Sequence, residues 1–352
     1  MKNIHYILWK AAPGGLEKVV NIYLSSSLKQ EYRLNIFSLR PSESDFLSSN
    51  NVPVHFGADS KIRLYPIFFK YALKNKNDIF HLLNSGPLIL LILRITGVKK
   101  IIYHIHGTKY WNKPIKKIML KPLWYLGLSG RVYIISNSRH SKNIFLKEVK
   151  RKCSISVVYN PIEVGEFQPV QNRRKKNIRI CYVGRLVNSK NLDTWLSVAN
   201  YINKDEQNFE FHIYGEGPLR ENLEKKIKQY KLTHRFFFHG FISSINKEYS
   251  KNDLLLFLSE YESFGNVVIE AILSGIPVIV SDIPSHREIL EDYPEFLVAL
   301  DERIEINVLE KIKSLNSLKE LILKARKEFI EKFKTDNHIN RIKEIYISLE
   351  TV

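Results

Sequence analysis

The chain has 352 residues, a mass of 41.3 kDa and a formal net charge of +18, and this length favours two domains of roughly 150 to 200 residues. With 44% hydrophobic and 26% charged residues, the composition excludes an intrinsically disordered chain. The two cysteines, Cys153 and Cys181, are too few for a disulfide framework or a four-thiolate zinc site, so we expect a reducing, cytoplasmic environment.

The first residues of the chain alternate without a long apolar stretch, and they predict a strand rather than a signal peptide. The longest apolar run, residues 87–93, is far shorter than the ~20 residues that span a bilayer. We therefore expect no transmembrane helix.

Short β-branched segments alternate with segments of helical period along the whole chain. In the first half, strands are predicted over residues 3–9, 34–39, 52–56, 78–82, 100–105, 131–136 and 156–159, with helices starting near residues 16, 63, 86, 112 and 138. In the second half, strands are predicted over residues 178–183, 210–214, 236–239, 254–258 and 277–281, each followed by a helix, and the chain is helical from about residue 301. This alternation predicts parallel sheets with crossover helices.

The segment between the two halves contains Pro161 and Pro169, followed by the polar run 171–177, and is the best linker in the sequence. We therefore predict two doubly wound α/β domains, 1–168 and 169–336. A last helix, at about residues 337–352, is expected to pack back on the first domain.

The positive charge is concentrated in the first half. Residues 1–170 contain 26 Lys and Arg but 9 Asp and Glu, whereas residues 171–352 contain 28 and 27. No acidic residue occurs between Asp78 and Glu148. Such a domain is expected to meet an anionic partner, which could be a nucleic acid, a membrane surface or a phosphorylated substrate. A solvated lysine-rich face is the alternative interpretation.

Glycines follow three of the predicted strands. Gly14 and Gly15 lie between the first strand and the first helix, where a glycine pair lets the backbone approach a phosphate. A plain tight turn would use the same residues. Gly184 and Gly215 end two strands of the second half and are further candidates for contact with a ligand.

Arg185 and Lys190 follow Gly184 around the start of a helix, which is a place that favours an anion. Two cations there suit a diphosphate, although two solvated surface cations would give the same pattern. In the segment 259–271, Glu262 precedes a helix that starts near Gly265 and Glu270 lies inside it among apolar neighbours. A carboxylate in such a position needs a partner, and the pair could serve sugar hydroxyls.

These residues carry a family resemblance. The E-x7-E pair in ESFGNVVIEAILSGIPVIVSD, together with GRLVNSKN, YGEGP, PGGLE and the HG of YHIHGT, resembles the family-four retaining glycosyltransferases. The resemblance is strongest from residue 179 to residue 290. It implies the GT-B fold, in which two Rossmann-like domains face each other across a cleft.

The resemblance also implies roles for single residues. Arg185 and Lys190 would neutralise the donor diphosphate, Glu270 would bind the ribose and Glu262 the transferred sugar. Backbone amides would come from the segment Phe264, Gly265, Asn266 and Val267. From the first domain, Gly15 would approach the diphosphate and His106 would line the sugar site, whereas His104 is expected to be a packed histidine.

No Asp-x-Asp occurs in the chain, so we expect no metal ion and no other cofactor, and Arg185, Lys190 and helix N-termini would replace the divalent cation. The family retains anomeric configuration, with front-face attack as its favoured account. Glu262 is therefore not expected to act as a glycosidase-type nucleophile.

A segment of the first half, residues 109–126, combines cations with interfacial aromatic residues, as membrane-surface helices do. The residues assigned to membrane or acceptor contact are Lys109, Trp111, Lys113, Lys116, Lys117, Lys121 and Trp124. A core-packed helix with a solvated lysine face is the alternative, and Pro122 is expected to kink or interrupt the helix.

Together these features predict transfer of a sugar from a nucleotide-sugar, with a UDP-sugar favoured, to a lipid-linked or saccharide acceptor in the synthesis of cell-surface polysaccharide or lipopolysaccharide. The enzyme would be cytoplasmic and peripheral on the anionic inner face of the cell membrane. An epimerase or a phosphorylase of the same fold is the alternative, and a basic nucleic-acid-binding protein is another. No nucleic-acid-binding motif is recognisable, so no nucleic-acid partner is expected.

Overall fold

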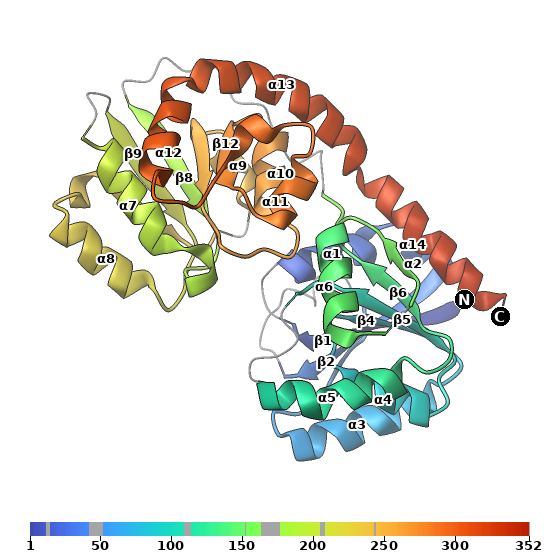
Figure 1. Ribbon diagram of the computed structural model, residues 1–352. Helices are drawn as coiled ribbons and strands as arrows, with labels where there is room; N and C mark the ends of the chain where they lie inside the picture. The colour runs from blue at the N-terminus through green and yellow to red at the C-terminus, as the bar shows by residue number, and fades with distance from the viewer. Residues whose placement is uncertain are drawn as a thin grey trace. The chain divides into compact units, whose positions relative to one another are not determined.

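The computed structural model describes residues 1–11, 15–41, 52–108, 114–151, 153–162, 177–204, 208–242 and 244–351. The chain forms two compact units (Figure 1). Unit 1 comprises Met1–Pro161 and Thr335–Val352, and unit 2 comprises Ile162–Lys334. The boundary predicted at residues 168 and 169 lies outside the described residues.

Unit 1 is built on a seven-stranded parallel sheet of order β3-β2-β1-β4-β5-β6-β7. Its elements in chain order are β1 (Lys2–Lys10), α1 (Gly15–Ser25), α2 (Leu28–Glu31), β2 (Tyr32–Arg40), β3 (Val54–Phe56), α3 (Lys61–Lys74), β4 (Ile79–Leu83), α4 (Pro87–Ile95), β5 (Lys100–Ile105), α5 (Pro114–Gly127), β6 (Tyr133–Ser136), α6 (Arg139–Val149), β7 (Ile155–Val157) and α14 (Thr335–Glu350).

Unit 2 is built on a six-stranded parallel sheet of order β10-β9-β8-β11-β12-β13. Its elements are β8 (Ile178–Val183), η3 (Asn188–Lys190), α7 (Leu192–Ile202), β9 (Phe209–Tyr214), α8 (Arg220–Gln229), η4 (Thr233–Arg235), β10 (Phe236–Gly240), α9 (Asn246–Tyr249), β11 (Leu254–Phe257), α10 (Asn266–Leu273), β12 (Val278–Ser281), α11 (Pro284–Ile289), η5 (Pro294–Phe296), β13 (Leu297–Val298), α12 (Ile304–Lys313) and α13 (Leu315–Lys332). The predicted doubly wound α/β class is confirmed.

The sheet of unit 1 is buried on both faces. One face packs against α1, α2 and α14, and the other packs against α3, α4, α5 and α6. The central strand β4 illustrates the consequence, because all five of its residues are buried. Strands covered on both faces are continuously apolar, which is why these segments were recognisable in the sequence.

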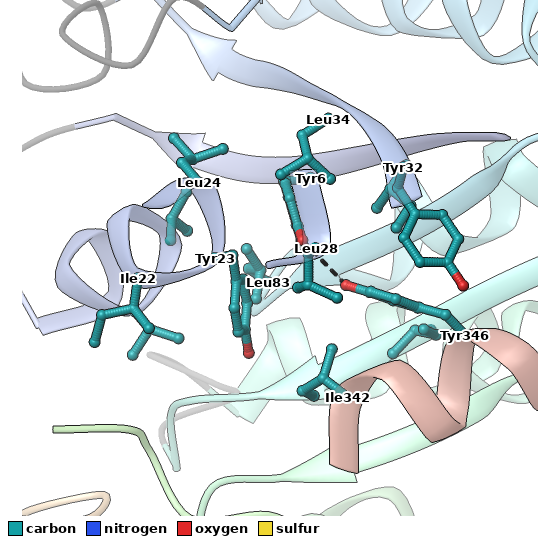
Figure 2. Packing of buried hydrophobic residues seen from close by; sticks show 14 of the residues in the cluster. Tyr6, Ile22, Tyr23, Leu24, Leu28, Tyr32, Leu34, Leu83, Ile342 and Tyr346 are labelled. Atoms are coloured by element: carbon teal, nitrogen blue, oxygen red, sulfur yellow. Dashed lines mark hydrogen bonds between the residues drawn. The ribbon is translucent and has the colours of Figure 1, made fainter. Parts of the chain in front are cut away.

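The last helix, α14, belongs to unit 1 although the whole of unit 2 precedes it in the chain. Its residues Ile339, Ile342, Ile345 and Tyr346 join the core cluster formed by β1, β2 and α1. Figure 2 shows Tyr346 reaching this cluster, where its hydroxyl donates to the hydroxyl of Tyr6 at 3.2 Å. The predicted C-terminal helix corresponds to α14.

The structure departs from the sequence predictions in two respects. Helix α5, which was expected to be kinked or interrupted at Pro122, is not interrupted there. Pro122 lies on the exposed side of the helix, where water can bind the carbonyl that loses its amide partner. The short elements α2 and β13 were not predicted, because four and two residues carry too little periodicity.

The strand order alone indicates where each unit is expected to bind a ligand. In each sheet the order reverses beside the first strand of the unit, between β1 and β4 and between β8 and β11. In open parallel sheets, ligands bind beyond the carboxyl ends of the strands at this point. None of the helices in the described ranges has the length and hydropathy needed to cross a bilayer.

Candidate functional site

Glycines bring the loops after β8, β9 and β10 into close contact. The amide of Gly184 donates to the carbonyl of Tyr214 at 2.9 Å, and the amide of Gly215 donates to the carbonyl of Gly240 at 2.7 Å. Gly215 has a φ of +147°, and a Cβ added there would lie 1.9 Å from the Gly184 carbonyl oxygen. Only glycine fits at this position. The strand ends of unit 2 therefore form one closely packed backbone surface.

Arg185 and Lys190 stand on the loop between β8 and α7, at the switch point of unit 2. The side chain of Arg185 is exposed, while its carbonyl accepts a hydrogen bond of 3.0 Å from the Tyr182 hydroxyl. The Lys190 side chain is mostly buried, with its Nζ 5.1 Å above the centre of the Phe257 ring. One cation is thus available to solvent and the other is held against the protein.

Glu262 lies on the neighbouring loop, after β11, and its carboxylate accepts a hydrogen bond from the Lys190 ammonium. The two residues are 72 positions apart in the chain. Both side chains are largely buried. Removing one partner of a buried ion pair strongly destabilises the folded protein, because the other charge is left without a partner. The fold therefore brings together the predicted diphosphate cation and the predicted sugar carboxylate.

Helix α10 begins directly beyond this pair. Its N-cap, Gly265, has a φ of +108°, and a Cβ there would lie 3.1 Å from the Cδ1 atom of Ile289. Phe264 is buried and packs edge-on against Phe333, with ring centroids 6.0 Å apart. Asn266 and Val267 form the first turn, where backbone amides lack intrahelical partners and can bind an anion.

Glu270 is buried inside α10, with 4% of its surface exposed. Its Oε2 accepts a hydrogen bond of 3.2 Å from the hydroxyl of Tyr249 on α9. Burial, reinforced by the Glu270 charge, raises the pKa of Tyr249 well above its usual range, so the phenol remains a donor. Tyr249 is the partner that a carboxylate among apolar neighbours needs, and no local pattern around Tyr249 indicated this contact.

His286 is a second residue that sequence reasoning missed. It is buried at the start of α11, against Gly265, and its Nδ1 lies 2.8 Å from the carbonyl oxygen of Ser281. Since that oxygen can only accept, Nδ1 carries the proton and Nε2 is left as an acceptor without a hydrogen-bond partner among the described residues. Burial lowers the pKa of His286 and keeps it neutral.

In unit 1, His106 follows β5 and ends a row of three imidazoles. Its ring centre is 4.0 Å from that of His104, and the Nδ1 of His104 is 3.2 Å from the Nε2 of His81. The Nδ1 of His81 is 2.8 Å from the hydroxyl of Tyr346 on α14. Burial, with the nearby His338 as a smaller cause, lowers the pKa of His106 to about 3, so this histidine is a neutral hydrogen-bonding group.

The other predicted residues of unit 1 have mixed outcomes. Gly15 is the first residue of α1 at the switch point, whereas Gly14, Lys109, Trp111, Lys113 and the side chain of Lys116 lie outside the described residues. The Nζ of Lys117 is 2.9 Å from the Glu148 carboxylate, and Lys121 is half-buried.

The assignment of Trp124 to the membrane contact is wrong. The side chain is 2% exposed and packs edge-on against Tyr103 and Phe145, with centroid distances of 5.1 and 5.2 Å. Trp124 lies on the side of α5 that faces the sheet, where its large apolar ring is covered completely.

Comparison with known proteins matches these elements to one family. Residues 164–335 match the model of the glycosyl transferases group 1. A 2-deoxystreptamine N-acetyl-D-glucosaminyltransferase of Niallia circulans is 26% identical over 87% of this chain and 85% of its own length. A UDP-Gal:alpha-D-GlcNAc-diphosphoundecaprenol alpha-1,3-galactosyltransferase of Escherichia coli is 24% identical over 80% of this chain and 78% of its own.

A solved structure shows the same fold. The crystal structure of HepE from Anabaena, in complex with UDP and glucose, has a TM-score of 0.82 at 18% identity and covers 99% of this chain and 100% of its own. The two parallel sheets and their helices are those of the GT-B fold. The match to the group 1 glycosyltransferases covers residues 164–335, and the likeness of the whole chain to the solved structure is one of fold.

Proposed function

We propose that the chain is a retaining glycosyltransferase that moves a sugar from a UDP-sugar to a lipid-linked or saccharide acceptor, in the synthesis of cell-surface polysaccharide or lipopolysaccharide. The observation that carries the proposal is the gathering of Arg185, Lys190, Glu262 and Glu270 beyond the carboxyl ends of β8 and β11. This is where a doubly wound sheet binds a nucleotide.

The leaving group of the reaction is a nucleoside diphosphate, on which negative charge grows as the glycosidic bond breaks. Arg185, exposed and not paired with any described carboxylate, is available to neutralise this charge. Lys190 can join it by exchanging Glu262 for the diphosphate, and the first turn of α10 adds backbone amides. With these groups the proposed reaction requires no metal ion and no other cofactor.

The two glutamates have different surroundings, and this difference supports different roles. Glu270 is rigidly held inside α10 by Tyr249 and is suited to bind the two ribose hydroxyls. Glu262 lies on a loop and shares Lys190, so it can turn to a hydroxyl of the transferred sugar when Lys190 moves to the diphosphate. His106 of unit 1 is proposed to form a hydrogen bond to a sugar as a neutral imidazole.

The proposed lipid-linked acceptor is supported by a relative and by the charge of the first half of the chain. The Escherichia coli relative is named for a diphosphoundecaprenol acceptor, and the first half of this chain carries the cationic excess that an anionic lipid or its diphosphate would attract. A peripheral position on the inner face of the cell membrane would give the enzyme access to both the acceptor and the cytoplasmic donor.

The donor can be tested by a thermal-shift screen across UDP-, GDP- and ADP-sugars, with and without EDTA. A ligand at 100 times its dissociation constant adds roughly 2.7 kcal/mol of stability, so the preferred base should be evident. Turnover of the donor with an undecaprenyl-diphosphate-linked sugar, followed by NMR of the product anomer, tests transfer and retention. Conversion of the sugar-nucleotide without an acceptor would point to an epimerase, and an inverted product or abolition by EDTA would contradict the proposal.

A further inference from the structure

Helix α3 exposes an apolar stripe. Ile62, with 85% of its surface exposed, is followed at helical spacing by Pro66, Phe69 and Leu73, which are also exposed. Positions i, i+4, i+7 and i+11 lie on one side of a helix. The opposite side of α3 is already occupied, because Leu64, Phe68 and Ala72 are buried in the core. The exposed stripe therefore lies on the side of α3 that faces away from the core.

Cations run alongside this stripe. Arg63, Lys70 and Lys74 each follow a residue of the stripe by one position, so they form a parallel line about 100° around the helix. All three are exposed, and none forms an ion pair with another described residue. α3 contains no acidic residue at all. An apolar line flanked by free cations is thus a property of the whole length of α3.

A second helix on the same face repeats the arrangement. On α5, Ile118 and Met119 are 75% and 67% exposed, and Leu126 is exposed two turns later. α3 and α5 both contact α4 and bury their other sides against the same face of the sheet (Figure 1). The exposed side chains of both helices therefore point away from the sheet. We name this set of residues, Ile62, Phe69 and Leu73 with Ile118, Met119 and Leu126, the α3–α5 surface.

The chemistry of the α3–α5 surface selects one class of partner. Single exposed apolar residues are ordinary, but aligned ones beside cations match helices that lie in a membrane interface, with apolar side chains among the acyl chains and cations at the headgroups. A nucleic acid would use the cations and gain nothing from Ile62, Phe69 and Leu73. The surface is also complementary in charge to anionic lipid, because residues 79–147, which include α5, contain no carboxylate that would repel the headgroups.

We propose that the α3–α5 surface inserts into an anionic phospholipid bilayer, with α3 lying flat in the headgroup region. This proposal rests on the glycosyltransferase function proposed above, and it identifies the part of unit 1 that contacts the membrane. It differs from the sequence-based assignment, because α3 replaces Trp124 as the apolar anchor. Insertion of apolar side chains also makes part of the binding insensitive to salt, whereas attraction by cations is screened.

Vesicle co-sedimentation of the full chain tests the proposal. The vesicles contain either phosphatidylcholine alone or an equal mixture with phosphatidylglycerol. The wild type should bind the mixed vesicles. The triple variant Ile62→Ser, Phe69→Ser, Leu73→Ser, which leaves the net charge unchanged, should bind at least about 10-fold more weakly at low and high salt. The variant Arg63→Gln, Lys70→Gln, Lys74→Gln should bind roughly 100-fold more weakly at low salt and approach the wild type at 1 M salt.

Matched controls use exposed residues elsewhere. The apolar control is Ile306→Ser, Leu323→Ser, Ile347→Ser, and the charge control is Lys225→Gln, Lys228→Gln, Lys319→Gln. Both should bind vesicles like the wild type. Every variant is first checked for unchanged thermal unfolding and nucleotide binding. If the α3–α5 surface binds a bilayer, the wild type and the serine variant should have the same oligomeric mass in solution. A wild-type dimer that dissociates in the serine variant would instead identify a second copy of the chain as the partner and overturn the proposal.

Two further results separate this proposal from the proposed function. If the wild type ignores anionic vesicles but still transfers sugar to a soluble short-chain acceptor, the membrane surface is wrong and the glycosyltransferase stands. If no nucleotide-sugar is used while the serine variant still loses vesicle binding, the surface stands and the proposed reaction fails. Equal vesicle binding by the wild type and the serine variant overturns the insertion directly.

Discussion

The two units of this chain share one architecture but differ in how their charges are distributed. Both bury imidazoles and phenols, such as His81 and Tyr6 in unit 1 and His286 and Tyr249 in unit 2. Unit 1 carries a large excess of cations, whereas the cations of unit 2 are balanced by carboxylates, and one such pair lies at the strand ends. The same parallel-sheet architecture thus accommodates both charge distributions.

The two charge distributions suit different ligands. Unit 2 places partnered charges, glycines and a helix start at its switch point, which are the elements that a nucleoside diphosphate needs. Unit 1 has a row of imidazoles inside β4 and β5 that ends at His106, and a cationic, apolar surface on α3 and α5. Changing one unit while the other serves as the reporter tests this difference.

The largest effect is expected at Tyr346, which completes the core of unit 1 from α14. Replacing Tyr346 by Ala should destabilise unit 1 by about 4 kcal/mol, because a buried ring is lost and the Nδ1 of His81 and the hydroxyl of Tyr6 lose a partner. Differential scanning calorimetry should show that unit 1 unfolds at a lower temperature than in the wild type. Tyr346→Phe, the matched control, should cost only about 1 to 2 kcal/mol.

Unit 2 serves as the reporter in this experiment. At a temperature below the first transition, calorimetric titration should give a nucleoside diphosphate affinity within about 2-fold of the wild type, because the residues proposed to bind it, apart from Gly15, lie in unit 2. A Tyr346→Ala protein that loses nucleotide binding in proportion to its stability would show that the two units do not behave independently.

The second effect is acid destabilisation of unit 1. Burial lowers the pKa of His338 to about 4 and that of His106 to about 3, from an ordinary value of 6.5, and the pKa values of His81 and His104 are lowered as well. A lowered folded pKa means that the unfolded chain binds more protons below pH 6.5. The stability contributed by these histidines is therefore full above pH 6.5 and is lost as the pH falls toward 4, by about 2 kcal/mol at pH 5 for His338 and for His106.

Urea unfolding between pH 7 and pH 5 measures this loss. His338→Gln should flatten the pH dependence of the unit 1 transition, because an amide can still donate to the carbonyl of Tyr159 and accept from the hydroxyl of Tyr23 without titrating. Unit 2, in which His286 and His212 are the buried imidazoles among the described residues, should lose less stability. An unchanged slope in the variant would count against His338 as a source of the effect.

The third effect is confined to catalysis in unit 2. Arg185→Ala should lower turnover about 100-fold, since a preformed contact to the leaving diphosphate is lost. Because the Arg185 side chain is exposed, the unfolding temperature should stay within about 1 °C. Lys319→Ala, which removes an exposed cation from α13, is the control and should change neither quantity. Full activity of the Arg185 variant would remove this residue from the proposed mechanism.

The smallest effect separates the two glutamates. Glu270→Gln should weaken binding of the free nucleoside diphosphate by about 10-fold, since one charged hydrogen bond to the ribose is lost. Its amide oxygen can still accept from Tyr249, so the helix should remain intact. Glu262→Gln should leave this binding within about 2-fold and lower turnover instead. Calorimetry with the free nucleotide decides, and equal weakening by both variants would refute separate roles.

The elements and the loops that carry the proposed chemistry could be predicted from local patterns in the sequence. Continuous apolar segments identified the buried strands, and the glycines, cations and carboxylates that follow strands had to meet at one edge because parallel strands end together. The spacing of Glu262 and Glu270 around the start of α10 was readable for the same reason, since helical period and cap signals are local properties of the chain.

Tertiary structure alone decided which groups are partners. The pairing of Lys190 with Glu262, of Tyr249 with Glu270 and of Tyr346 with Tyr6 joins residues that are 72, 21 and 340 positions apart. It also decided that Trp124 is covered while Ile62 on α3 is exposed. Periodicity shows that a helix has apolar sides, but the side that meets the sheet is set by long-range packing, which no local pattern contains.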